Sequence, residues 1–148
     1  MAEQAKQQTV EPGPRPILPF LKLEPKPHLV GTKCSCGALY LDVKRIACSK
    51  CGSTGPFQQV ELSDKGKVWV FSVVHQSFPG IKTPYVTVIV DLPEGLSVRS
   101  NLVGVDPDEI EKNPKQVFGM PVEMVTSVVA KDRQGADVVA FQYRPSKS

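Results

Sequence analysis

Apolar and polar residues alternate along short segments through the second half of the chain. Six of these segments are rich in β-branched and aromatic residues and are bounded by turn formers, a pattern typical of β-strands. We expect strands at residues 57–62, 67–75, 85–92, 96–105, 122–131 and 136–144. Segments 67–75 and 85–92 carry more apolar residues than the interior of a small barrel requires, which favours contact with another surface.

A short helix is expected over residues 106–113, DPDEIEKN. Asp106 can cap its start, Pro107 suits the first helical position, and Glu109 completes the spacing of a capping box. Five or six short strands interrupted by one helix predict a small closed barrel of the oligonucleotide/oligosaccharide-binding (OB) type over residues 57–148. A five-stranded sandwich is the alternative, and either way the fold class is mainly β.

Residues 1–30 form a proline-rich arm with six prolines. Proline restricts its own backbone and that of the preceding residue, so the arm should be extended rather than helical. For residues 1–14 we expect a disordered tail. Residues 15–30 are richer in aliphatic side chains and should dock on a surface, either the chain's own domain or another chain.

All four cysteines lie between residues 34 and 51, in two close pairs. Cys34 and Cys36 form C-x-C-G, one residue tighter than the usual knuckle, and Cys48 and Cys51 form C-x-x-C-G. Two such pairs separated by a short loop match the spacing of tetrahedral thiolate sites, and the glycine after each pair lets the backbone curl past a metal. We therefore predict a rubredoxin-like zinc ribbon over residues 31–56.

Zinc is the expected metal because thiolates are soft donors, and iron is the less favoured occupant. Two disulfides, or four unrelated free thiols, are the alternatives. With four protein sulfurs no coordination position stays open for a catalytic water, so the site should be structural. Nearby basic residues could offset the negative charge of a zinc–tetrathiolate centre: Lys33, Lys44, Arg45 and Lys50.

The amino terminus has no apolar stretch of a secretory signal, and no apolar run approaches the roughly 18 residues of a membrane span. We therefore expect a cytoplasmic protein with reduced thiols and no membrane contact. The net charge is +3, but residues 57–148 hold ten basic against eleven acidic residues. The predicted barrel is thus a poor electrostatic match for nucleic acid.

Single-stranded nucleic-acid binding is nevertheless the alternative function, since zinc ribbons and OB barrels both serve it. The aromatic residues that could stack on bases also suit a core: Trp69, Phe71, Tyr85, Phe141 and Tyr143. Independent catalysis is disfavoured, because no phosphate-binding, dinucleotide-binding or nucleophile-elbow motif occurs. His28 lies in the arm, and His75 ends a predicted strand without an acidic residue nearby in sequence, so both favour a structural role.

Several motifs in order carry a family resemblance. They are the cysteine ribbon ending CGS (51–53), GKVWVFSVVH (66–75), PYV (84–86), NLVGVDPDE (101–109) and GMPVE (119–123). Together they resemble a bacterial and archaeal family, long catalogued as a domain of unknown function, that joins a rubredoxin-like zinc ribbon to an OB-fold. The resemblance covers residues 31–144, and the proline-rich arm departs from the amphipathic helix often found before the ribbon.

The resemblance implies a non-catalytic subunit, in a hetero-oligomer with a thiolase-superfamily protein that carries the catalytic residues. It implies a β-ketoacyl-CoA substrate, aromatic or steroidal, as in a benzoylsuccinyl-CoA-type thiolase. Of the family's site residues only Cys34, Cys36, Cys48 and Cys51 carry over firmly, as metal ligands. Residues that could contact the partner or a coenzyme A thioester at the interface are Lys33, Arg45, His75, Phe78 and Gly80.

Overall fold

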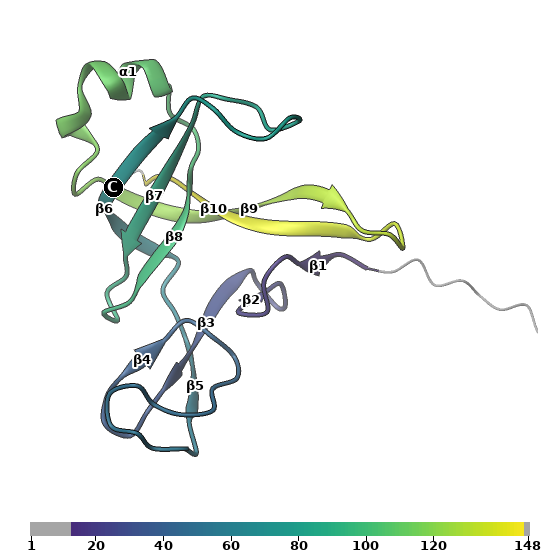
Figure 1. Ribbon diagram of the computed structural model, residues 1–148, viewed down its shortest axis with the longest axis vertical. Coiled ribbons are helices and arrows are strands. Elements are labelled where there is room, and N and C mark those ends of the chain that lie inside the picture. Colours follow the sequence, from purple (N-terminus) through teal and green to yellow (C-terminus); the bar gives the residue numbers. More distant parts are fainter. Residues whose placement is uncertain (1–12, 147–148) are drawn as a thin grey trace, which may run out of the picture.

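The computed structural model describes residues 13–146 and contains a closed five-stranded barrel above a smaller sheet (Figure 1). The barrel strands are hydrogen-bonded in the order β6-β7-β8-β10-β9, and β9 returns to β6. Because β6 and β9 pair with each other, the predicted OB-type barrel is confirmed and the sandwich is wrong. The bounds are β6 Lys65–Val74, β7 Tyr85–Asp91, β8 Ser97–Leu102, β9 Pro121–Lys131 and β10 Asp137–Pro145.

The interior of the barrel follows the alternation in the sequence. Val86, Val88 and Val90 of β7 are all buried, while the residues between them are only partly buried. The expected core role of the strand aromatics is confirmed for Phe141 and Tyr143 and wrong for Trp69, which is 57% exposed. Trp69 lies at a bulge between Val68 and Val70, where β6 has one more residue than β7. A bulge turns the following side chains to the other face, which a strict period of two cannot anticipate.

Gly66 marks a close approach between the start of β6 and the end of β7. A Cβ atom at this position would lie 2.6 Å from the Asp91 carbonyl oxygen and 2.6 Å from Val90 Cγ1. Both distances are shorter than van der Waals contact, so the strands can pack this closely only when residue 66 has no side chain.

The predicted helix forms as α1, Pro107–Lys112, followed by a 3-10 turn at Pro114–Gln116 that the pattern did not predict. The Asp106 side chain accepts a hydrogen bond from the Asp108 amide at 3.0 Å, which confirms the cap. Glu109 lies within 3.7 Å of the Lys112 ammonium, one turn later in the helix. Helix α1 covers the upper end of the barrel in Figure 1.

The smaller sheet contains the cysteine ribbon. Its strands are β2 Leu21–Lys22, β3 His28–Lys33, β4 Leu39–Tyr40 and β5 Gln58–Glu61, with β3 pairing with all three others. The strand expected at 57–62 thus forms, but its placement in the barrel was wrong, because β5 pairs with β3. A boundary at residue 57 therefore cuts through the ribbon's sheet.

The arm docks on its own chain, as predicted for residues 15–30. Its first strand, β1 Arg15–Pro16, runs parallel to β10, and the Ile17 amide donates to the Val139 carbonyl at 2.8 Å. Leu21 and Leu29 are fully buried and belong to the same apolar cluster as the barrel valines. One core thus spans both sheets. Of the tail predicted at 1–14, residues 1–12 lie outside the described part of the chain.

Candidate functional site

The two cysteine pairs are separated along the ribbon's backbone, but their sulfur atoms lie close together. The four sulfurs lie within 4.8 Å of one another, so the four cysteines could hold a metal ion. Cys34 Sγ is 3.5 Å from Cys51 Sγ, and Cys36 Sγ is 3.7 Å from Cys48 Sγ. A tetrahedron with metal–sulfur bonds of about 2.3 Å has edges of about 3.8 Å, so the spacing fits a tetrathiolate site. All four thiols are free, so the alternative of two disulfides is wrong.

Tight turns present each pair of sulfurs. The Gly37 amide donates to the Cys34 carbonyl and the Gly52 amide to the Cys48 carbonyl, each at 2.9 Å. Both glycines have positive φ, 93° and 77°, which is strained for other residues. Each turn is thus closed by a hydrogen bond from the glycine after the second cysteine to the carbonyl of the first, across three residues in the C-x-C turn and four in the C-x-x-C turn.

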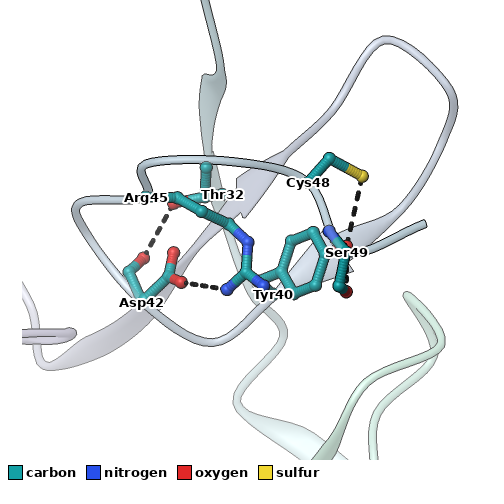
Figure 2. A network of polar contacts seen from close by, with 6 residues as sticks. All are labelled: Thr32, Tyr40, Asp42, Arg45, Cys48 and Ser49. Atoms are coloured by element: carbon teal, nitrogen blue, oxygen red, sulfur yellow. Dashed lines mark hydrogen bonds and ion pairs between the residues drawn. The ribbon is translucent and has the colours of Figure 1, made fainter. Parts of the chain in front are cut away.

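A polar network joins the second turn to the ribbon's sheet (Figure 2). The Tyr40 hydroxyl lies 3.2 Å from the Cys48 sulfur and accepts a hydrogen bond from the Ser49 amide at 3.1 Å. The Arg45 guanidinium stacks over the Tyr40 ring at 3.3 Å and donates to Asp42 at 2.8 Å. Tyr40 is thus held from both sides. Neither Tyr40 nor Asp42 was singled out from the sequence, where nothing marks them except their place inside the ribbon.

The pKa values of the thiols diverge because each sulfur has different hydrogen-bond donors and different neighbouring thiols. The Tyr40 hydroxyl, aided by backbone amides, lowers the pKa of Cys48 to about 5. The amide of Cys36 lowers the pKa of Cys34. The Ser53 amide hydrogen-bonds to Cys51, but the neighbouring thiols of Cys34 and Cys48 outweigh it and raise the pKa of Cys51 to about 12. Four thiolates cannot form this close together without a cation, which is the electrostatic condition of a metal site.

The five expected contact residues fall into two groups at opposite ends of the molecule. Lys33 and Arg45 belong to the ribbon, where Lys33 is exposed and Arg45 is engaged with Tyr40 and Asp42. The other three follow β6, in the loop that leaves the opposite end of the barrel in Figure 1: His75, Phe78 and Gly80. The structure therefore does not bring the five together.

In that loop Phe78 is 81% exposed and Gly80 has a positive φ of 90°. His75 has an acidic partner after all, because its Nε2 lies 2.5 Å from a carboxylate oxygen of Glu111 in α1. The pair spans 36 positions, so it could not be seen in the local sequence. Glu111 anchors the base of the loop to the helix.

Within residues 13–146, no helix is long and apolar enough to cross a membrane.

Comparison with known proteins identifies the family. Residues 59–127 match the model of the C-terminal OB-fold domain of ChsH2. A DUF35 domain-containing scaffold protein of Methanothermobacter thermautotrophicus is 34% identical over 80% of this chain and 86% of its own length. The benzoylsuccinyl-CoA thiolase subunit BbsA of Geobacter metallireducens is 39% identical over 66% of each chain.

A solved structure has the same fold. It is described as the Ltp2-ChsH2(DUF35) aldolase, and it superposes with a TM-score of 0.58 at 32% identity, covering 80% of this chain and 84% of the other. The similarity extends over most of both chains. The chain therefore belongs to the DUF35 family, and residues 59–127, which include most of its barrel, match the C-terminal OB-fold domain of ChsH2.

Proposed function

We propose that the chain is a non-catalytic accessory subunit of an enzyme complex of the thiolase superfamily that acts on acyl-CoA in the cytoplasm. The observation that most strongly supports this proposal is the chain's similarity to BbsA, a benzoylsuccinyl-CoA thiolase subunit, and to the chain solved as part of the Ltp2-ChsH2(DUF35) aldolase. The archaeal relative is described as a scaffold protein, which supports the same role.

The distribution of reactive side chains supports a non-catalytic role. The four thiols are gathered in one cluster, where they suit a metal. His75 is paired with Glu111 on the surface, and His28 Nδ1 lies 2.7 Å from the Lys26 carbonyl oxygen. The thiols and the two histidines are thus each engaged in a cluster, an ion pair or a backbone contact, and none of them needs a catalytic role. The partner subunit would therefore supply the nucleophile and the acid–base groups.

The metal we propose is zinc, held by Cys34, Cys36, Cys48 and Cys51. Four thiolates fill a tetrahedral coordination sphere, so zinc would cross-link the ribbon and would leave no position for substrate. The negative charge of the four sulfurs would be partly balanced by the zinc and by hydrogen bonds from the Tyr40 hydroxyl and the backbone. Metal binding would then contribute directly to folding of the ribbon.

We further propose that the two ends of the molecule make separate contacts. The loop with His75, Phe78 and Gly80 presents an exposed aromatic ring suited to a protein surface. Lys33, exposed at the other end, suits a phosphate of coenzyme A. Arg45 is held inside the ribbon and would act there by orienting Tyr40. A bulky aromatic or steroidal acyl group is the proposed substrate of the complex.

The direct test is gentle purification of the tagged chain from its own cells, followed by native mass spectrometry. Co-purification of a thiolase-superfamily subunit in fixed ratio is the expected result. The purified partner should then lose acyl-CoA activity or stability when this chain is removed and regain it on reconstitution. A bare chain, a chain carrying nucleic acid, or a partner equally active and stable alone would contradict the proposal.

A further inference from the structure

The OB barrel has a groove on the face that OB-folds generally use for binding. Ligands of this fold usually meet its second and third strands, between the loop after the first strand and the loop between the last two. Here these elements are β7, β8, the loop at residues 75–84 and the β9–β10 hairpin. Figure 1 shows the loop and the hairpin projecting toward the same side. An open groove of about 610 Å³ is lined by residues of all these elements.

The walls of the groove are aliphatic and come from distant parts of the chain. Ile17 and Leu18 belong to the docked arm, Ile81 to the loop and Val129 to β9. Each of these large apolar side chains exposes more than a third of its surface. Single exposed apolar residues are common, whereas four that converge on one groove mark an interaction site.

The groove also carries positive charge without a matching negative one. Arg99 on β8 and Lys82 in the loop line it, and none of its lining residues is acidic. Among the ion pairs of residues 13–146, neither Arg99 nor Lys82 takes part. A ligand that fits the groove should therefore combine aliphatic surface with at least one carboxylate.

The floor of the groove is polar because the barrel is only loosely closed there. Strands β8 and β10 share a single residue pair, Leu102 with Tyr143. Beyond that pair the Ser100 hydroxyl, instead of a backbone amide, donates to the Phe141 carbonyl at 2.9 Å. Ser100 is flanked in the groove by Asn101 and by Gln142. Their hydroxyl and amide groups can hydrogen-bond to the backbone of an incoming peptide segment.

We propose that this groove docks a segment of the partner protein in which aliphatic side chains flank one or more Asp or Glu residues. The aliphatic side chains pack against Ile17, Ile81 and Val129, and the carboxylate pairs with Arg99. A nucleic acid is a poorer fit, because Tyr85 is the only aromatic ring of the lining that is more than marginally exposed. With a thiolase-superfamily subunit as the partner, the inference rests on the function proposed above.

The experiment repeats the purification from the chain's own cells with full-length variants. Ile81→Glu and Val129→Glu place a carboxylate in the apolar wall, and each should lower the recovered partner at least tenfold. Ile46→Glu is the matched control, since Ile46 is 85% exposed but lies in the ribbon. Arg99→Glu should release the partner, whereas Arg99→Lys should retain most of it. Unchanged thermal unfolding shows that each variant is folded.

A photo-crosslinking amino acid at position 81 of the otherwise unaltered chain tests the chemistry of the occupant. The cross-linked peptide should come from the partner and contain aliphatic residues next to Asp or Glu. If the groove variants retain the partner to the same extent as Ile46→Glu does, the groove is not the docking site, and the proposed function stays intact. A cross-link to a second copy of this chain also overturns the groove. An unaltered chain without any thiolase-superfamily partner refutes both.

Discussion

The Arg15 guanidinium lies 2.8 Å from the Asp132 carboxylate, joining the docked arm to the turn of the β9–β10 hairpin across 117 positions of sequence. Arg15 is the first cause that lowers the pKa of Asp132, and the Ala136 and Gln134 amides add to it. The contact therefore holds together two elements whose strands, β1 and β10, are already paired.

We expect this contact to make the stability of the fold depend on pH in the acid range. Because the folded pKa of Asp132 is lowered, its contribution is fully present above the usual value of 3.8 and is lost as pH falls through the folded pKa. Asp132→Asn keeps an oxygen for the turn but removes the charge, so it should lower the melting temperature at pH 6. The difference from the unaltered chain should shrink as the pH falls below 3.8 and through the lowered folded pKa. Melting curves at pH 2.5, 4 and 6 check this, and a difference independent of pH would contradict it.

The arm should be an integral part of the core rather than an appendage. Leu21→Ala removes a fully buried side chain and should destabilise the chain by about 2–5 kcal/mol. Leu18→Ala, three residues earlier and partly exposed, should change stability by no more than about 0.5 kcal/mol. Urea unfolding followed by Trp69 fluorescence measures both. Equal effects would mean that Leu21 is not packed in the common core.

Gly66→Ala should be destabilising, because the new methyl group would collide with the Asp91 carbonyl and Val90. We expect a loss of about 1–3 kcal/mol, the usual cost of overpacking. Gly13→Ala is the control, since no atom lies within 4 Å of a Cβ at that position. Thermal unfolding of the two variants compares them, and a harmless Gly66→Ala would show that β6 and β7 can separate at this point.

Tyr40→Phe should make the ribbon release metal at a higher pH. The Tyr40 hydroxyl is the largest cause that lowers the pKa of Cys48 to about 5, so the thiolate persists into mild acid. Phenylalanine keeps the ring beneath Arg45 but loses this hydroxyl, so protons would compete with the proposed zinc at higher pH. Release of the metal to a chromogenic chelator across pH 4–8 measures the midpoint, with Ser35→Ala, at an exposed position of the first cysteine turn, as the control. No shift, or a downward shift, would contradict the role of the hydroxyl.

The strands and the thiol cluster could be predicted from the sequence because each depends on the spacing of residues that lie close together in the chain. A period of two indicates which face of a strand is buried, and the positions of Cys34 to Cys51 indicate a tetrahedral site. Neither signal indicates which strand pairs with which. Strand β5 has the alternation expected of a barrel strand, yet its hydrogen bonds go to β3.

The rest depends on contacts between residues far apart in the chain. Glu111 meets His75 only because α1 covers the end of β6 where the loop begins. The groove exists only where Ile17, Ile81 and Val129 converge from the arm, the loop and the hairpin. Each of these residues alone looks like an ordinary surface position, so no local pattern could reveal the site.

Within residues 13–146, strand β10 pairs with three others, β1, β8 and β9, and it follows all of them in the chain. During translation β1 of the arm has no paired strand until β10, much later in the chain, has left the ribosomal tunnel. The barrel cannot close before then, because the seam between β8 and β10 is still missing. Contacts between the two ends of a chain form slowly, since the longest loop must be ordered first. The arm residues that contact β10, among them Ile17, therefore stay undocked until that strand is made, and this is the period in which chaperones would be needed.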